Sequence, residues 1–141
     1  MTHTAIPAFE TTMQTTHVWI GELMAQLGWS DRQRAYAALR AVLHALRDHL
    51  SPEAAAALGA QLPMLVRGFY YEGWRPSGKP LKERKLNEFL AHVEENLRSN
   101  GAIDPRQVSQ QVFALLKSHL SEGEIHSVQA ALPAALQSLW P

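Results

Sequence analysis

The stretch that decides the fold is His49–Pro63, HLSPEAAAALGAQLP, because a related stretch follows 70 residues later. The second copy runs from His119 to Pro133 and reads HLSEGEIHSVQAALP. The two copies share His-Leu-Ser at the start and Leu-Pro at the end, and they align without a gap. An ungapped match of this kind indicates an internal duplication and predicts two similarly folded halves.

The same offset aligns apolar residues with apolar residues upstream of this stretch. The pairs are Trp19 with Phe89, Ile20 with Leu90, Leu23 with Val93, and Leu27 with Leu97. We therefore predict an all-α fold, a helical bundle of about eight helices in two tandem, pseudo-symmetric four-helix halves. Because a half alone would have a marginal core, both halves are expected to form one domain. The expected boundaries are a flexible N-terminal tail over 1–14, a first half over 15–71, a linker over 72–84 and a second half over 85–141.

Helix-start signals stand at the expected places in both halves. Ser30–Gln33 is a capping box, in which the serine hydroxyl accepts the backbone amide three residues later. Ser51-Pro52, Asp104-Pro105 and Ser121–Glu124 are further N-cap signals, with proline tolerated at the first helical position. Apolar residues recur at steps of three and four after these signals, and no stretch sustains the period-two alternation of a strand. The sequence thus indicates helices and argues against a sheet.

Pro63 and Pro133 occupy the same position in the two halves, and we interpret both as structural residues. A proline inside a helix costs about 3 kcal/mol, because it loses a backbone hydrogen bond and clashes with the preceding turn. Each proline therefore either kinks one long helix or separates two helices. For Pro63 we favour the second alternative, with a short fourth helix over Met64–Tyr71.

Composition restricts the possible functions. The 141 residues contain 13 basic and 13 acidic side chains, so no net charge favours a polyanion or an acidic partner. The lack of cysteine excludes disulfides, thiolate metal sites and thiol catalysis. No apolar run is long enough for a signal peptide or a membrane span. We expect a cytoplasmic protein that does not associate with membranes.

Three separated motifs, in order along the chain, resemble a bacterial family of unknown function, DUF2267. They lie at Arg34–Leu50, at Gln61–Trp74 and in the closing segment Ser121–Trp140. The resemblance covers nearly everything from Thr15 to Trp140. It implies an all-helical protein without an established activity, so it supplies no catalytic, cofactor-binding or metal-binding residues.

His49 and His119 occupy equivalent positions, each at the end of the second helix of its half. A metal site would need two or more imidazoles that converge with a carboxylate. The sequence has no His-x-x-x-His pair, and His44 and His49 diverge by about 140° around a helix. A histidine in the last helical turn can bond the carbonyl groups left without partners there. We therefore interpret His49 and His119 as structural, partly buried and hydrogen-bonded, and we predict no metal and no cofactor.

Residues 67–85 combine aromatic side chains with six positive and two negative charges. Such interleaving is typical of sites that bind anions or single-stranded nucleic acid, where cations contact phosphates and rings stack on bases. The alternative is that the rings belong to the core and the cations to a solvated helix face. The candidate contacts are Arg67, Tyr70, Tyr71, Trp74, Arg75, Lys79 and Lys82.

Arg40, His44 and Arg47 share one face of the helix that precedes Ser51, and this arrangement would suit a small anion pocket. The alternative is a solvated face or an ion pair with a glutamate of another helix. The capping serines are explained by their structural role, and none of the common catalytic motifs occurs. The sequence therefore names no catalytic residue.

Three functions stay open at this point. The first is a non-enzymatic helical interaction protein that binds a protein partner, or a second copy of itself, through an apolar groove between helices. The second is an anion or single-stranded nucleic-acid binder that uses residues 67–85. The third is a small-molecule enzyme whose site forms only in the folded chain. The tandem helical halves and the lack of catalytic motifs favour the first.

Overall fold

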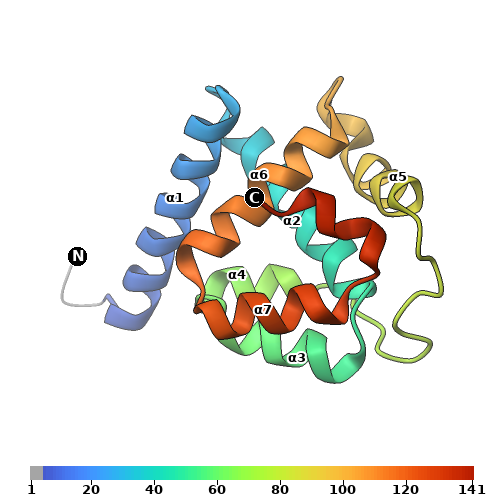
Figure 1. Ribbon diagram of the computed structural model, residues 1–141. Helices are drawn as coiled ribbons and strands as arrows, with labels where there is room; N and C mark the ends of the chain where they lie inside the picture. The colour runs from blue at the N-terminus through green and yellow to red at the C-terminus, as the bar shows by residue number, and fades with distance from the viewer. Residues whose placement is uncertain (1–4) are drawn as a thin grey trace.

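The computed structural model describes residues 5–141, which fold into helices and connecting loops (Figure 1). These residues contain seven α-helices, two 3₁₀ segments and no β-strand, so the predicted all-α fold is confirmed. Within the same range, no helix combines the length and the apolar character needed to cross a membrane. In chain order the elements are α1 Pro7–Leu27, α2 Arg32–Asp48, α3 Pro52–Gln61, α4 Met64–Tyr71, α5 Leu86–Leu97, η2 Arg98–Asn100, α6 Pro105–His119, α7 Glu122–Ala131 and η3 Ala134–Leu139.

The helices of the two halves pack around one shared core. α1 and α5 lie on opposite sides of a central pair formed by α2 and α6, and α3 lies beside α7 (Figure 1). α1 packs on α2 and α6, and α5 packs in turn on α6 and α2. Each of these two helices thus packs on the central helix of its own half and on that of the other half, as a two-fold axis between the halves would produce. The internal duplication itself stays a prediction. The largest fully buried side chains come from both halves and include Leu23, Leu46, Tyr70, Phe89 and Phe113.

α1 begins at Pro7, eight residues earlier than the sequence pattern predicted. The expected flexible tail over 1–14 was therefore wrong from Pro7 onward, and residues 1–4 lie outside the described part of the chain. Proline is suited to the first position of a helix, because the N–H that it lacks would have no partner there. α1 ends at Leu27 and is followed by Gly28, whose φ of 69° is the left-handed conformation that glycine adopts without strain.

The predicted caps start three of the helices. Ser51, Asp104 and Ser121 each accept backbone amides of the following turn at 3.0–3.4 Å. For α2 the cap is Asp31 rather than Ser30, with Oδ1 of Asp31 3.2 Å from the amide of Arg34. Aspartate caps a helix about as well as serine does, so the start of α2 moves by one residue without loss of the cap.

Pro63 and Pro133 separate elements rather than kink one long helix. α3 ends at Gln61 and α4 occupies Met64–Tyr71, so the short fourth helix predicted for the first half is confirmed. Pro133 lies between α7 and η3, which makes the fourth element of the second half a 3₁₀ segment. Both prolines have extended backbone, with ψ of 151° and 144°, and each stands directly before the element that follows.

Candidate functional site

The inward-facing stripe of α1 continues beyond the part of the helix that the core covers. Ile20 and Leu23 on this face are buried. Toward the N-terminus the same face carries Ile6, Phe9 and Met13, and the side chains of Phe9 and Met13 are 56% and 52% exposed. Steps of three and four residues place all five on one side of the helix. The first third of α1 therefore presents an uncovered apolar stripe, which we call the α1 stripe (Ile6, Phe9 and Met13).

A groove of about 760 Å³ runs beside the α1 stripe, between α1, α2 and α4. Gly68 of α4 lines it, and a Cβ at this position would meet no other atom within 4 Å, so the lack of a side chain leaves the groove open. Arg32 and Glu72 contribute one charge of each sign. The main apolar lining residues are Met13, Ile20, Tyr36, Leu65 and Phe69.

Specific contacts fix the walls of this groove. Oγ1 of Thr12 in α1 accepts a hydrogen bond from the amide of Leu65 at 2.9 Å. This amide belongs to the first turn of α4, where backbone N–H groups have no partner inside the helix. The rings of Tyr36 and Phe69 meet edge to face, with centroids 5.2 Å apart, and join α2 to α4. The groove is therefore a built part of the fold.

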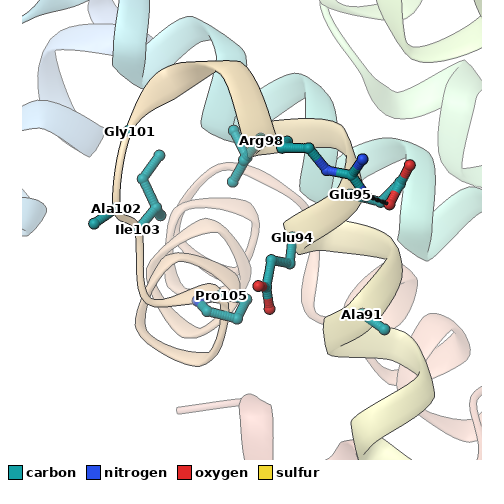
Figure 2. A pocket seen from close by; sticks show the side chains of 9 residues that line it. Ala91, Glu94, Glu95, Arg98, Gly101, Ala102, Ile103 and Pro105 are labelled. Atoms are coloured by element: carbon teal, nitrogen blue, oxygen red, sulfur yellow. Dashed lines mark hydrogen bonds and ion pairs between the residues drawn. The ribbon is translucent and has the colours of Figure 1, made fainter.

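A second hollow, of about 570 Å³, lies between the end of α5, η2 and the loop that leads to α6 (Figure 2). Arg98 pairs with Glu95, and Figure 2 shows this pair on the side away from Gly101 and Pro105. The carboxylate of Glu94 lies toward Pro105. One carboxylate beside apolar side chains is too small a set of polar groups to define a ligand, so the α1–α2–α4 groove is the stronger candidate.

The two equivalent histidines lie where their sequence positions predicted, at the ends of α2 and α6. Nδ1 of His49 lies 2.7 Å from the carbonyl oxygen of Ala45, in the same half. Nε2 of His119 lies 2.6 Å from Oε2 of Glu22, in the other half. Both hydrogen bonds match the expected geometry, and a structural role for the two residues stays a prediction.

Two residues that the sequence analysis did not single out, Glu83 and His92, lie beside His49. Oε1 of Glu83 is 3.4 Å from Nε2 of His49 and 2.7 Å from Nε2 of His92. The three candidate ligand atoms all lie within 4.8 Å of one another. Because they come from the end of α2, the linker and α5, no spacing within one helix signals this cluster.

The structure places the aromatic residues of the 67–85 segment in or against the core. Tyr70 is fully buried, and its hydroxyl donates to the carbonyl oxygen of Ala55 at 2.7 Å. Tyr71 and Trp74 are half-buried and pack against the core cluster. The interpretation of Tyr70 as a stacking platform for a base was therefore wrong, because no base can reach its ring in this fold.

The basic residues of the same segment differ in how far the fold engages them. Arg67 donates to the carbonyl oxygens of Gly59 and Leu62, both at 2.9 Å, and so satisfies the end of α3. Arg75 and Lys82 are exposed, while Lys79 is half-buried. The buried ring of Tyr70 and the bonded Arg67 thus have structural roles, while anion binding through the other cations of the segment stays a prediction.

Arg40, His44 and Arg47 do not form an anion pocket, because their side chains already have partners. Arg47 is buried and donates to the carbonyl oxygens of Tyr70 and Glu72 at 2.7 and 2.9 Å, so the expected solvated face was wrong. Nε of Arg40 lies 3.3 Å from Oε1 of Glu72, which is the predicted ion pair with a glutamate.

His44 is also buried, and its Nε2 lies 2.6 Å from the carbonyl oxygen of Phe69. Burial lowers the pKa of His44 below its usual value, and the positive charges of Arg47 and Arg40 act in the same direction, although the bond to Phe69 opposes them. A carbonyl oxygen only accepts, so the neutral ring carries its proton on Nε2 and donates it there. His44 and Arg47 thus satisfy the C-terminal end of α4.

The fold and the groove define an all-helical protein with a largely apolar groove between three of its helices. The family model described as "Uncharacterized conserved protein (DUF2267)" matches residues 16–139. The chain therefore belongs to this family, and the resemblance carried by its three sequence motifs is confirmed. No match to the chain was found among the curated proteins.

Proposed function

We propose that this protein is a helical interaction protein that associates with a second copy of itself through the face formed by α1 and α4. The observation that carries the proposal is the uncovered α1 stripe beside the apolar groove. Leu65 of α4 lines the groove and Met64 precedes it in the chain, and both are large apolar residues left exposed. Exposed apolar side chains gathered around a groove are typical of surfaces that bind other proteins.

The α1 stripe and the groove suit each other as ligand and receptor. An amphipathic helix binds in an apolar groove through side chains three and four residues apart, which is the spacing of Ile6, Phe9 and Met13. In a two-fold dimer, the start of α1 from each copy occupies the groove of the other copy, and every contact occurs twice. One chain carries both parts on a single face, and this favours a second copy as the partner.

The charge distribution also favours this partner. Thirteen basic and thirteen acidic side chains leave no net charge to repel a second copy. Glu10 lies in the first turn of α1, next to the α1 stripe, and Arg32 lines the groove. When α1 enters the groove of the other copy, these opposite charges approach each other.

Light scattering coupled to size-exclusion chromatography, at protein concentrations up to the millimolar range, tests the proposal. We expect the mass of the wild-type protein to rise from monomer to dimer. A variant with Phe9→Ser and Met13→Ser should stay monomeric, because each lost apolar contact removes about 1.5–3 kcal/mol of burial. Val18→Ser is the matched control, since Val18 is 49% exposed and lies on the opposite side of α1 from Phe9.

Gly68→Leu provides an independent variant. A side chain at this position points into open space, so it should fill the groove and leave the core unchanged. It should also prevent the dimer, while circular dichroism and the unfolding midpoint should show an intact fold. A wild-type protein that stays monomeric over the whole range would overturn the proposal. A dimer that persists in both the stripe variant and Gly68→Leu would overturn it as well, because it would use another face.

A further inference from the structure

His49 holds a buried nitrogen atom that lacks a partner. Its side chain is 1% exposed, and Nδ1 lies 2.7 Å from the carbonyl oxygen of Ala45. Because a carbonyl oxygen only accepts, Nδ1 carries the proton and Nε2 of the neutral ring presents a lone pair. Among the described residues this Nε2 atom has no hydrogen-bond partner. A buried polar atom in this state is costly, and it therefore points to a group that would satisfy it.

The lone pair of His49 faces two further ligand atoms. Leu81 of the linker donates its amide to the carbonyl oxygen of Asp48 at 2.9 Å, and this bond holds the linker over the end of α2. Glu83 follows two residues later and brings Oε1 to 3.4 Å from Nε2 of His49. His92 of α5 brings its own Nε2 to 2.7 Å from the same oxygen.

A cation between these atoms would balance their charges. A carboxylate only accepts hydrogen bonds, so Glu83 and the neutral ring of His49 present lone pairs to each other. His92 can donate one hydrogen to Glu83, but this bond leaves the nitrogen of His49 unsatisfied. A divalent ion would accept all three lone pairs at once and would remove the repulsion between His49 and Glu83.

We propose that His49, Glu83 and His92 bind a divalent transition-metal ion, with zinc as the ion that fits best. Two imidazoles and one carboxylate, without a thiolate, form a donor set that binds zinc in preference to magnesium and calcium. The hydrogen bond from Nδ1–H of His49 to Ala45 fixes the ring in the tautomer that a metal requires. Three protein ligands leave a fourth tetrahedral position for water.

The separation between the ligand atoms of His49 and Glu83 suits a tetrahedral ion. Two donor atoms about 2.1 Å from a tetrahedral zinc lie about 3.4 Å apart. Nε2 of His49 and Oε1 of Glu83 already have this separation. His92 must move away from Glu83 by about 0.7 Å to reach the same separation, and its side chain, which is 42% exposed, has room to rotate.

A hollow of about 330 Å³ lies beside the cluster, and His49 and Glu83 help to line it. The rest of its wall includes Pro80, Lys82, Arg84 and Pro133. This hollow gives water access to the ion from the linker side. His92 comes from α5 and completes the donor set.

Titration of the chelator-treated protein with zinc chloride, followed by calorimetry and by elemental analysis after dialysis, tests this site. We expect one zinc ion per chain and a higher unfolding temperature with zinc, because an ion that binds only the folded state stabilises it. Glu83→Gln and His92→Gln should each weaken zinc binding more than ten-fold. Both residues are partly exposed, so these variants are expected to fold, whereas a change at the buried His49 risks unfolding the protein.

The double variant Glu22→Gln with His119→Gln is the matched control, because it changes the contact between α1 and α6 that aligns with His92 and His49, and it should leave zinc binding unchanged. Cobalt chloride provides a spectroscopic measurement, since a tetrahedral site with histidine ligands gives the intense visible absorption of four-coordinate cobalt. The proposal is overturned if the wild-type protein binds no stoichiometric zinc. It is also overturned if Glu83→Gln and His92→Gln bind zinc as tightly as the wild type.

Discussion

We call the contacts around His49 the His49 joint and the contacts around His119 the His119 joint. The two histidines align at the offset of 70 residues, but the two joints differ in their chemistry. His49 meets an aromatic ring of the other half edge-on at a centroid distance of 5.2 Å, whereas His119 stacks on its aromatic neighbour at 4.6 Å. One turn further along the neighbouring helix, a polar residue approaches each histidine. At the offset of 70 residues the equivalent pairs are His49 with His119, Phe89 with Trp19, and His92 with Glu22.

The linker makes the difference between the two joints. It passes over the end of α2, adds the carboxylate of Glu83 and leaves the side chain of His49 1% exposed. The side chain of His119 is 26% exposed, and its Nε2 is hydrogen-bonded to the carboxylate of Glu22. One backbone arrangement thus supports a potential metal site in one place and a surface ion pair in the other. The neighbours of each histidine, rather than its place in the 70-residue alignment, decide its chemistry.

The largest effect on stability is expected from Phe89→Ala. This change removes the ring that contacts both His49 and the core residue Phe113. Phe89 is fully buried and also meets Phe113 at a centroid distance of 6.0 Å. We expect the free energy of unfolding to fall by about 3–5 kcal/mol, as measured by urea denaturation. Trp19→Phe, which gives the other joint the same residue type, should cost less. Equal losses in the two variants would contradict the difference between the joints.

A smaller effect is expected from His119→Ala. This change removes the bond to Glu22 and the stacking on Trp19, both of them partly exposed to solvent. We expect a loss of about 1–2 kcal/mol in the free energy of unfolding and no change in zinc content. Chemical denaturation together with elemental analysis checks both parts. Loss of a bound metal in this variant would show that the metal belongs to the His119 joint.

The smallest effect is expected from His44→Gln, which tests a histidine that only the first half has, since Ala114 stands at the equivalent position. The pKa of His44 is lowered in the folded state, so the unfolded chain binds a proton more readily. The stability contributed by neutral His44 is complete above pH 6.5 and is lost as the pH falls through the lowered pKa.

Glutamine can still donate a hydrogen bond to Phe69 but does not titrate. We therefore measure the free energy of unfolding by urea denaturation at pH 7.5 and at pH 5. The decrease from pH 7.5 to pH 5 should be smaller for His44→Gln than for the wild type. Identical losses in the two proteins would mean that burial of His44 makes no contribution to the acid sensitivity.

The elements of the fold were predictable because their signals are local. Ser51, Asp104 and Ser121 cap the helices that they were expected to cap, and Pro63 separates two helices as favoured. The extension of α1 was missed because Ile6, Phe9 and Met13 are separated by threonines and other polar residues. In sequence, such widely spaced apolar residues look like those of an unstructured tail. The groove beside it needed the position of α4, which no local pattern provides.

By itself the sequence determined most of the helices, three of their caps and their apolar faces, because each depends on residues a few places apart. Only the tertiary structure decided that the rings of the 67–85 segment are covered and that Arg47 is buried. It also decided which side chains meet at His49. Glu83 and His92 reach this residue from 34 and 43 positions away, through the packing of α5 on α2 and the path of the linker. Such a convergence depends on how whole helices cross, and local side-chain preferences carry no record of that crossing.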